Sequence, residues 1–476
     1  MPAPVVTVEA MRAWEARTWA AGVDQAAVIR RAGLGVAGVA AAMASARAPV
    51  LILAGHGHNG DDAEVAGGAL EGRAVTSCRL RAPESFAEAR DWLARHRGRM
   101  DALVVDGMFG IGLNRAPEGA WATLVDAVNG SGIPVLAVDV PSGLDADTGR
   151  VLGIAVKASV TVTLGAVKRG LLEESASDHV GRLEVAHEIG LVPWDGASLG
   201  EWIVPADFVA FPPRRAASSH KGSYGHVVVV AGSRGYHGAA VLAARAAGRA
   251  RPGLVTVVTE ERTYVPVAAG LQSAMVRDWT GEAWDGFGAT ALVVGPGLAS
   301  AGLSPAWRAE FLRVWHEATC PVVVDASALD WLPADSPVAG MRVVTPHPGE
   351  AGRMLGRTSH EVQSDRVSAA LGIVGRWAKV GVWVVLKGRH TLVVSPQRTW
   401  AVNGSGNPGL AQGGTGDVLA GYLGGWLAQP GMIADPGPVL RHAVWKHGAV
   451  ADRLEASGDA WTAEDLAVAI GSRCTP

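Results

Sequence analysis

The stretch NGSGNPGLAQGGTGDVLAG, residues 403–421, carries seven glycines and a single acid, Asp417. Each glycine costs roughly 1 kcal/mol against alanine inside a helix, so this density indicates that something must approach the backbone closely. The segment GGTGD is typical of a glycine turn that opens a helix, where backbone N–H groups and the helix dipole favour an anion. We interpret it as a phosphate cradle in which Asp417 acts as a general base on a hydroxyl. The alternative is that Asp417 is a simple N-terminal cap.

Unusual residues also follow several apolar, strand-like runs in the same half of the chain: GPG at 295–297, TPHPGE at 345–350 and KGRHT at 387–391. Ligands of open α/β sheets bind at the carboxyl ends of the strands. Lys387, directly after such a run, suits pairing with a phosphate, although a solvated lysine at a strand end would look the same. His347 lies between two prolines that favour an extended backbone, and we interpret it as a substrate contact rather than a structural histidine.

The first half has candidates of its own, in HGHNGDD (56–62) and DVPSGLDADTG (139–149). Asp139 directly follows a strand-like run and is the candidate catalyst. Asp145 and Asp147 fit turn chemistry and capping.

Composition limits the class of protein. The chain has 476 residues, enough for two or three domains, and its net charge of −3 gives no reason to expect nucleic acid or an anionic membrane. Cys78, Cys320 and Cys474 match neither a zinc spacing nor a disulfide framework. The N-terminus is not a signal peptide, and runs such as HVVVVAG are too short to span a membrane. We therefore expect a cytoplasmic protein without membrane or nucleic-acid partners.

The elements that must position these residues follow a regular rhythm. Helical patterns cover 8–20 and 24–45, and apolar strand-like runs then alternate with helix-like stretches up to about residue 190. Residues 191–219 break this rhythm with prolines and small residues, which indicates a domain boundary, and a second alternating block begins at 226. The pattern predicts two α/β domains, each with a parallel sheet between helices.

The C-terminal motifs, together with SHKGSYGHVVVVAGS at 219–233, resemble the ADP/ATP-dependent NAD(P)H-hydrate dehydratase family over residues 213–476. The resemblance implies a ribokinase-like αβα fold and a repair reaction, in which the hydroxyl of hydrated NAD(P)H is phosphorylated by a nucleotide and phosphate is then eliminated. It favours ADP over ATP as the co-substrate, with Mg²⁺. The implied substrate contacts are Ala240, Gly297, His347 and Asp417, and the implied nucleotide contacts are Lys387, Gly388, Arg389, His390, Thr391 and Gly416.

The N-terminal half resembles the NAD(P)H-hydrate epimerase family over residues 1–205, through segments such as LILAGHGHNGDDAEVAG (51–67) and LGAVKRGLL (164–172). This implies a Rossmann-like αβα domain that interconverts the R and S hydrates, NADHX and NADPHX. Asp139 would transfer protons, and Asn59, Asp106 and Ser142 would ligate potassium. The implied substrate contacts are His58, Asn59, Gly60, Asp61, Asp62, Gly110, Ile111, Gly112, Leu113, Asn114, Arg115, Ala116 and Asp139. We also expect a homo-oligomer.

One loop departs from the epimerase pattern. The family normally has NNGGDG where this chain has HNGDDA, residues 58–63. A side chain at Asp61 would be strained if the glycine it replaces needed a positive φ, and its charge would repel a diphosphate nearby. We therefore hypothesise that epimerase activity is reduced or lost, unless the loop adapts.

Two other functions remain open at this point. The N-terminal half could be a non-catalytic binding or scaffold domain beside an active dehydratase. The C-terminal half could be a ribokinase-like small-molecule kinase, because GTGD also fits simple phosphoryl transfer. A Rossmann dehydrogenase is disfavoured because G-x-G-x-x-G does not follow the first strand.

Overall fold

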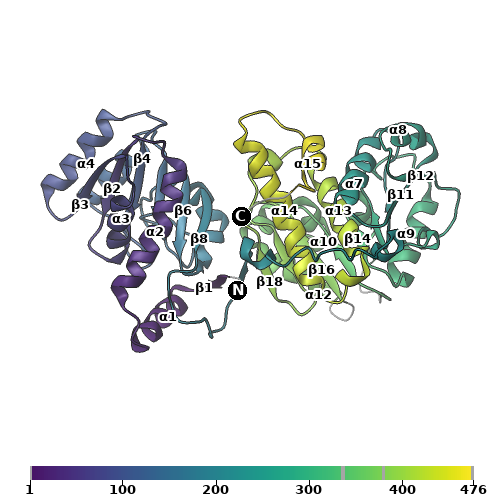
Figure 1. Cartoon of the computed structure of the whole chain (residues 1–476), viewed down its shortest axis with the longest axis horizontal. Helices are drawn as coiled ribbons and strands as arrows, with labels where there is room; N and C mark the ends of the chain where they lie inside the picture. The colour runs from purple at the N-terminus through teal and green to yellow at the C-terminus, as the bar shows by residue number, and fades with distance from the viewer. Residues whose placement is uncertain (1–2, 334–337, 378–380, 473–476) are drawn as a thin grey trace. The chain divides into compact units, whose positions relative to one another are not determined.

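The computed structural model describes residues 3–333, 338–377 and 381–472. They form two compact units, residues 3–202 and the residues from 203 on (Figure 1). The boundary predicted from the sequence, between residues 205 and 213, follows directly after this division.

The N-terminal unit is built on a parallel sheet of strand order β3-β2-β4-β5-β6-β8. Alternate residues of its strands face opposite layers: Val50 and Ile52 pack with one pair of helices, and Leu51 and Leu53 with another. The strands are β2 (Pro49–Ala54), β3 (Ala74–Arg79), β4 (Leu103–Gly107), β5 (Val135–Val138), β6 (Val160–Leu164) and β8 (Arg182–Ala186).

Helices cover both faces of this sheet, so the predicted three-layer αβα architecture is confirmed. One layer holds α2 (Gln25–Met43) and α3 (His58–Gly68), and the other holds α4 (Pro83–Arg95) and α5 (Ala120–Asn129). Among the described helices, α2 is long and apolar enough to cross a membrane by length and composition, but it contacts α3, β4, β6 and β8 as a core helix. The short α6 (Ser177–Val180) precedes β8.

Strand pairing also holds the start of the chain. Strand β1 (Ala3–Val6) pairs parallel with β7 (Val167–Lys168) and antiparallel with β9 (Gly200–Trp202). The helix α1 (Val8–Ala20) follows β1, as the sequence pattern predicts, and brings Glu15 to the same region as Lys168.

The C-terminal unit has a longer sheet, of strand order β12-β11-β10-β13-β14-β15-β16-β17-β18. The strands up to β16 are parallel, and β17 and β18 are antiparallel to their neighbours in this order. Their bounds are β10 (His226–Val230), β11 (Leu254–Thr259), β12 (Met275–Asp278), β13 (Ala291–Val294), β14 (Val322–Val324), β15 (Arg342–Val344), β16 (Val382–Leu386), β17 (Leu392–Val394) and β18 (Trp400–Val402).

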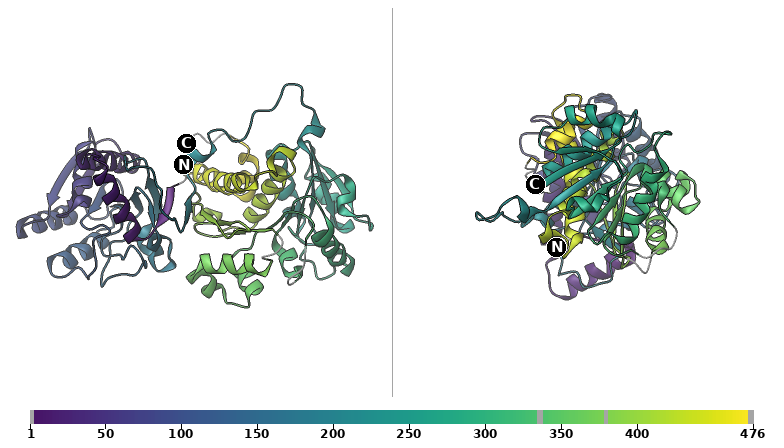
Figure 2. Two further views of the ribbon diagram at one scale, coloured as in Figure 1. Left: turned by 90° about the horizontal axis from the view of Figure 1, so that it is seen from below. Right: turned by 90° about the vertical axis from the view of Figure 1, so that its right-hand side faces the viewer.

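This sheet also lies between two helical layers. Figure 2 shows the yellow α14 (Pro436–Ala456) on one side of the sheet and the green helices of residues 348–376 on the other. The first layer also contains α7 (His237–Arg249), α13 (Thr415–Leu427) and α15 (Ala463–Ala469). The remaining helices are α8 (Tyr264–Ala269), α9 (Pro305–Glu317), α10 (Pro348–Leu355), α11 (Ser359–Ser364) and α12 (Arg366–Arg376).

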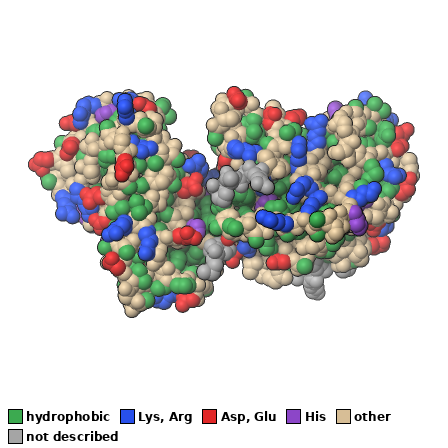
Figure 3. Space-filling model, viewed as in Figure 1, with side chains coloured by type: hydrophobic (Ala, Val, Ile, Leu, Met, Phe, Trp, Pro, Cys, Tyr) green, Lys and Arg blue, Asp and Glu red, His purple; other side chains and the backbone are tan. Residues whose placement is uncertain are grey.

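The surface carries charges of both signs. On the face that Figure 3 shows, Lys and Arg side chains are interspersed with Asp and Glu side chains. This distribution agrees with the small net charge of −3 and supplies no extended field of one sign for a polyanion.

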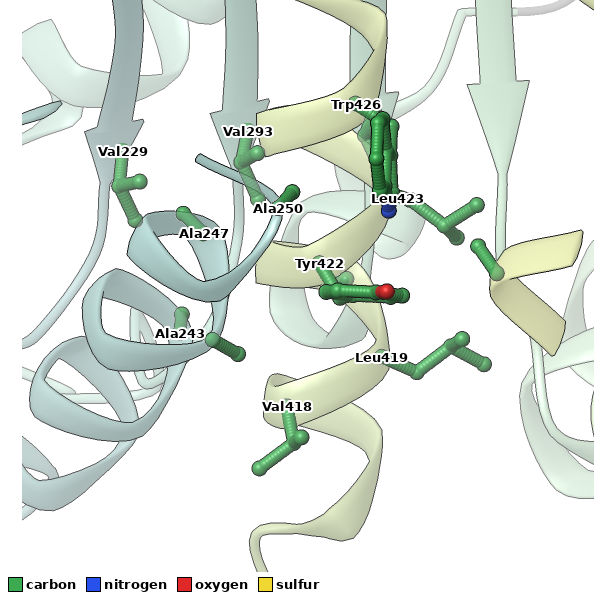
Figure 4. Packing of buried hydrophobic residues seen from close by; sticks show 14 of the residues in the cluster. Val229, Ala243, Ala247, Ala250, Val293, Val418, Leu419, Tyr422, Leu423 and Trp426 are labelled. Carbon is green, nitrogen blue, oxygen red and sulfur yellow. The ribbon is translucent and has the colours of Figure 1, made fainter. Parts of the chain in front are cut away.

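The glycines of residues 403–421 meet different structural requirements, which corrects the single explanation inferred from the sequence. Gly414 caps α13 with φ of +97°, a left-handed conformation that favours glycine. Gly421, in contrast, faces α7, where a Cβ atom would lie 2.0 Å from the carbonyl oxygen of Ala243. Figure 4 shows α7, with Ala243 and Ala247, next to α13, whose Leu419 and Tyr422 side chains point to the other side. Gly421 therefore serves helix packing and does not serve an anion.

We predict that Gly421→Ala lowers the free energy of unfolding by about 1–3 kcal/mol, because the new methyl group overpacks the α7–α13 contact. Gly248→Ala is the matched control in α7, since a Cβ atom there meets no atom within 4 Å; it should be neutral or stabilising by at most about 1 kcal/mol. Thermal unfolding of both variants measures the difference, and equal melting temperatures would contradict this account of the packing.

Candidate active sites of the two units

In the C-terminal unit, charged groups converge at the carboxyl ends of β14, β15 and β16. Lys387 Nζ donates to Asp325 Oδ1 at 2.5 Å, and Thr345 Oγ1 donates to the same carboxylate at 2.7 Å. The backbone N–H of Lys387 also donates to the carbonyl of Pro346 at 2.9 Å, so the TPHPGE and KGRHT motifs lie side by side. The motifs that follow these strands therefore lie together, as the sequence predicts.

The glycine turn before α13 lies against this group. A Cβ atom on Gly416 would be 3.4 Å from Lys387 Nζ and 3.9 Å from Asp325 Oδ2, so the start of α13 lies in contact distance of this pair. A Cβ atom on Gly413 would meet nothing within 4 Å, and Gly413 is exposed. The turn is therefore open at Gly413, while Leu242 and Ala463 lie against Gly414. The first N–H groups of α13 have no partner within the helix and can bind an anion.

The charges around Asp417 alter its acidity. Burial raises the pKa of Asp417 to about 7, and the nearby Asp325 carboxylate adds to the effect, while Lys387 opposes it. Burial alone would lower the pKa of Lys387, but the carboxylates of Asp325 and Glu350 reverse this and raise it. A carboxylate with a pKa near neutrality can accept a proton at physiological pH and later release it, which suits a general base better than a simple cap.

His347 has the structural role that the sequence left as its alternative. Its Nδ1 accepts from the backbone N–H of Gly349 at 3.0 Å, and it caps α10 with an extended backbone, φ −81° and ψ 168°. The side chain is nevertheless 53% exposed, with Nε2 3.5 Å from Glu350 Oε1. His347 can therefore cap the helix and still reach a bound substrate.

The other two predicted substrate contacts differ from each other. Gly297 has φ of +67°, and a Cβ atom there would lie 2.5 Å from the carbonyl oxygen of Tyr236, so a close backbone approach explains this glycine. The Ala240 side chain is fully buried in the core beside Gly232. A substrate contact through the Ala240 side chain is thus incompatible with the structure, and only its backbone could take part.

The predicted nucleotide segment, Lys387 to Thr391, is the turn between β16 and β17. Gly388 and His390 have positive φ angles of +130° and +54°. Arg366 Nη2 donates to the carbonyl oxygens of Leu386 and Lys387, both at 3.1 Å, and so holds the turn. Burial lowers the pKa of His390 to about 3, so His390 carries no charge for a phosphate. Arg389 is exposed and Thr391 half-buried.

Sequence reasoning missed three groups at this site: Asp325, Glu350 and His447. Asp325 ends the apolar run PVVVDAS, so the strand-end argument that selected Lys387 could have selected it too. Glu350 is buried, and its Oε2 lies 3.9 Å from Lys387 Nζ. His447 Nε2 lies 2.9 Å from the carbonyl oxygen of Thr415. The two residues are 32 positions apart, and no pattern in the sequence indicated that they meet.

The N-terminal unit has a cavity of about 750 Å³ at the carboxyl end of its sheet. It is lined by His58, Asn59, Asp62, Asp139 and residues 110–115 among the predicted contacts. Gly60, Asp61 and Ala116 do not line it. Gly60 instead lies against Gly55, where a Cβ atom would be 2.3 Å from the carbonyl oxygen.

The three predicted potassium ligands are brought together beneath this cavity. Ser142 Oγ donates to Asp106 Oδ1 at 2.6 Å, and Asn59 Nδ2 donates to the carbonyl of Phe109 at 2.8 Å. Asn59 Oδ1 is buried and has no hydrogen-bond partner among the described residues. Burial raises the pKa of Asp106 to about 6, although Ser142 and Met108 donate to it. An orphaned amide oxygen beside a carboxylate, a hydroxyl and a carbonyl is a donor set that fits a hard cation.

Asp139 is held in a strained position by a buried lysine that the sequence did not single out. Its φ is +65°, and its Oδ1 accepts from Lys168 Nζ at 2.5 Å. Lys168 is 1% exposed and also donates to the carbonyl of Leu164 at 2.7 Å. Burial, with the nearby Asp139 and Asp61 carboxylates, raises the pKa of Asp62 to about 8. The cavity therefore contains an ion pair and a carboxyl that holds a proton at neutral pH.

The strain argument against HNGDDA is wrong. Residues 58–63 are the first turns of α3, and Asp61 is not among the described residues with a positive φ. The Asp61 carboxylate pairs with Arg79 Nη2 at 2.7 Å, which offsets its charge, and Asp61 lies outside the cavity lining. The strain reason for an impaired epimerase site is thereby removed, whereas the charge of Asp61 is offset by Arg79 but still helps to raise the pKa of Asp62 in the cavity.

Two αβα units with charged groups at the carboxyl edges of their sheets define a two-site α/β enzyme. Residues 227–471 match the family model described as NAD(P)H-hydrate dehydratase, and residues 25–170 match that described as YjeF-related protein N-terminus. The bifunctional NAD(P)H-hydrate repair enzyme Nnr of Gloeobacter violaceus is 38% identical over 93% of this chain and 92% of its own length. That of Escherichia coli is 34% identical over 85% and 81%. The chain belongs to the family of bifunctional NAD(P)H-hydrate repair enzymes.

A solved structure is similar to part of this chain. It is described as ADP/ATP-dependent NAD(P)H-hydrate dehydratase from Bacillus subtilis, co-crystallised with ATP and Mg²⁺. It is 31% identical, covers 54% of this chain and 91% of its own, and has a TM-score of 0.48.

We predict that Asp417→Asn stabilises the protein at pH 8 and not at pH 4. The pKa of Asp417 is raised from 3.8 to about 7, so the stability that its bound proton contributes is present below about pH 4 and is lost as pH rises through 7. The expected gain in melting temperature at pH 8 is about 2–6 °C. Asp330→Asn, at an exposed ion pair with Arg353, is the control, and a gain that is the same at both pH values would contradict the buried-carboxylate account.

Proposed function

We propose that this chain restores hydrated nicotinamide nucleotides, NADHX and NADPHX, to NADH and NADPH. In this proposal, residues 213–476 dehydrate the S hydrate with ADP or ATP, and residues 1–205 interconvert the R and S hydrates. The observation that carries the proposal is the position of Asp417, in the first turn of α13 and close to the Lys387–Asp325 pair.

Asp417 would take the proton from the ring hydroxyl of the hydrate while the hydroxyl oxygen attacks the terminal phosphorus of the nucleotide. The bond from that phosphorus to the nucleotide breaks, and the shortened nucleotide leaves. The amides of residues 414–416 and the ammonium of Lys387 would hold the phosphoryl charge. In the second step the carbon–oxygen bond breaks, phosphate leaves, and loss of a ring proton restores the double bond.

Substrate placement would come from Gly297, His347 and the backbone at Ala240. The turn from Gly388 to Thr391, with Gly416, would hold the nucleotide. Magnesium supplies charge neutralisation at the phosphates when bound.

In the N-terminal unit the cavity of about 750 Å³ has a size that suits a nucleotide-sized ligand. Asp139, held in place by Lys168, would move the proton of the substrate. His58, Asn59, Asp62 and residues 110–115 would surround the ligand. Asn59, Asp106 and Ser142 would hold potassium, which supplies a fixed positive charge near the diphosphate when bound. The formed cavity and ion pair favour an active epimerase over a non-catalytic scaffold, and the epimerase-like half disfavours a simple small-molecule kinase.

The same proposal includes a cytoplasmic location and a homo-oligomer. Cys78 and Cys320 are free thiols, which supports a reducing compartment; Cys474 lies outside the described residues. Apolar side chains are exposed on α8 and on the neighbouring edge strand β12, including Val265 at 72% and Met275 at 43%. This surface supports self-association.

The dehydratase assignment is tested by mixing the hydrates with ADP or ATP and Mg²⁺ and following the absorbance of reduced nicotinamide. Asp417→Asn should lower the recovery rate at least about 100-fold, because the general base is lost, while nucleotide binding measured by calorimetry is largely kept. Unchanged turnover by the variant would end the assignment of Asp417.

The epimerase assignment is tested in the same assay by the extent of recovery. The wild-type chain should recover the full signal from a mixture of epimers. Asp139→Asn should recover only the S fraction during the period in which spontaneous epimerisation is slow. Glu64→Gln, an exposed member of the Arg79 pair, serves as the control with full recovery. Recovery of only the S fraction by the wild type would support the scaffold alternative instead.

A further inference from the structure

Asp325 has no role in the function proposed above, although it is the most buried charge at that site. It is 1% exposed, and its Oδ1 accepts from both Thr345 and Lys387. A carboxylate fixed in this way cannot follow a ligand outward. The Lys387 side chain is 18% exposed and has a flexible stem, so Lys387 is the member of the pair that can move to a phosphate.

The structure also indicates where the Lys387 side chain would move. Lys387 Nζ lies 3.4 Å from the position of a Cβ atom on Gly416, directly beneath the amides at the start of α13. A phosphate held by those amides therefore comes within reach of Lys387 after a small shift. Asp325 then loses part of its positive partner but stays buried beside Asp417.

Five titratable groups face the start of α13 from the surrounding elements. They are Asp325 after β14, His347 and Glu350 at the start of α10, Lys387 after β16, and His447 on α14. Burial lowers the pKa of His447 to about 4, so it is neutral. The charge felt by Asp417 thus depends mainly on Asp325, Glu350 and Lys387.

We propose that Asp325 is a positioning residue that couples nucleotide binding to proton abstraction. It holds Lys387 beneath Gly416 in the free enzyme, and when Lys387 turns to the nucleotide phosphate, the uncompensated charge of Asp325 makes Asp417 a stronger base. The base then becomes effective when the phosphoryl donor is in place. This inference rests on the proposed dehydratase function and assigns a further residue to it.

The electrostatic direction supports this coupling. The Asp325 carboxylate raises the pKa of Asp417 and the Lys387 ammonium lowers it. Moving the cation toward a phosphate weakens the second effect and leaves the first.

The test is the pH dependence of kcat for the S hydrate at saturating nucleotide. Asp325→Asn should move the acid limb to lower pH by about one unit, a tenfold change in proton concentration, and lower the plateau. Lys387→Gln should move the limb the opposite way. Asp330→Asn, at the exposed pair with Arg353, is the control and should leave the limb in place.

The outcomes distinguish failure of the proposed coupling from failure of the proposed dehydratase function. An unmoved acid limb in Asp325→Asn, in an enzyme that Asp417→Asn inactivates, would overturn the coupling and leave the dehydratase intact. Failure of the wild-type chain to dehydrate the hydrate would overturn the proposed function itself. If Asp325→Asn does not fold, the Lys387→Gln shift alone decides, because an unmoved or lowered limb there contradicts the coupling.

Discussion

A buried lysine–aspartate pair stands at the carboxyl edge of each sheet, and the sites are arranged around these two pairs. Lys168 with Asp139 and Lys387 with Asp325 both have Nζ–Oδ1 distances of 2.5 Å. Removing two charges from water costs several kcal/mol per ion, and such a pair persists only when further hydrogen bonds satisfy it. Here the backbone N–H of Leu164 and the hydroxyl of Thr345 supply them. Loss of one partner would leave an uncompensated charge in the core.

The parallel sheets explain why the polar groups gather at one edge. Both faces of each sheet are covered by helices, so strand interiors are apolar and buried, as Val227, Val229 and Val293 are. In these central strands a charged side chain can reach solvent or a ligand only where the strand ends. Because parallel strands end on the same side, residues far apart in sequence, such as Asp325 and Lys387, meet there.

The HNGDDA segment shows how tertiary context changes the meaning of a substitution. An added carboxylate beside a diphosphate site looks unfavourable, but Asp61 lies in α3 and its carboxylate turns to Arg79 at the end of β3. Arg79 also pairs with Glu64 at 2.8 Å. Strand β3 is an edge strand whose sequence, AVTSCR, is half polar, and no pattern in the sequence predicted it or its arginine.

The sequence by itself determined the two α/β units, the apolar strands and the strand-end motifs, because burial on both faces demands continuous valine-rich runs and binding loops demand glycine. It also indicated Asp417, Lys387, Asp139 and Asn59 as candidate site residues. Only the tertiary structure decided that Gly421 serves helix packing, that the Ala240 side chain is in the core, and that Asp325 and Lys168 hold the central charges. These depend on distances between segments separated by tens of residues, and the free energy of a buried charge is set by its neighbours in space, which the order of residues along the chain does not state.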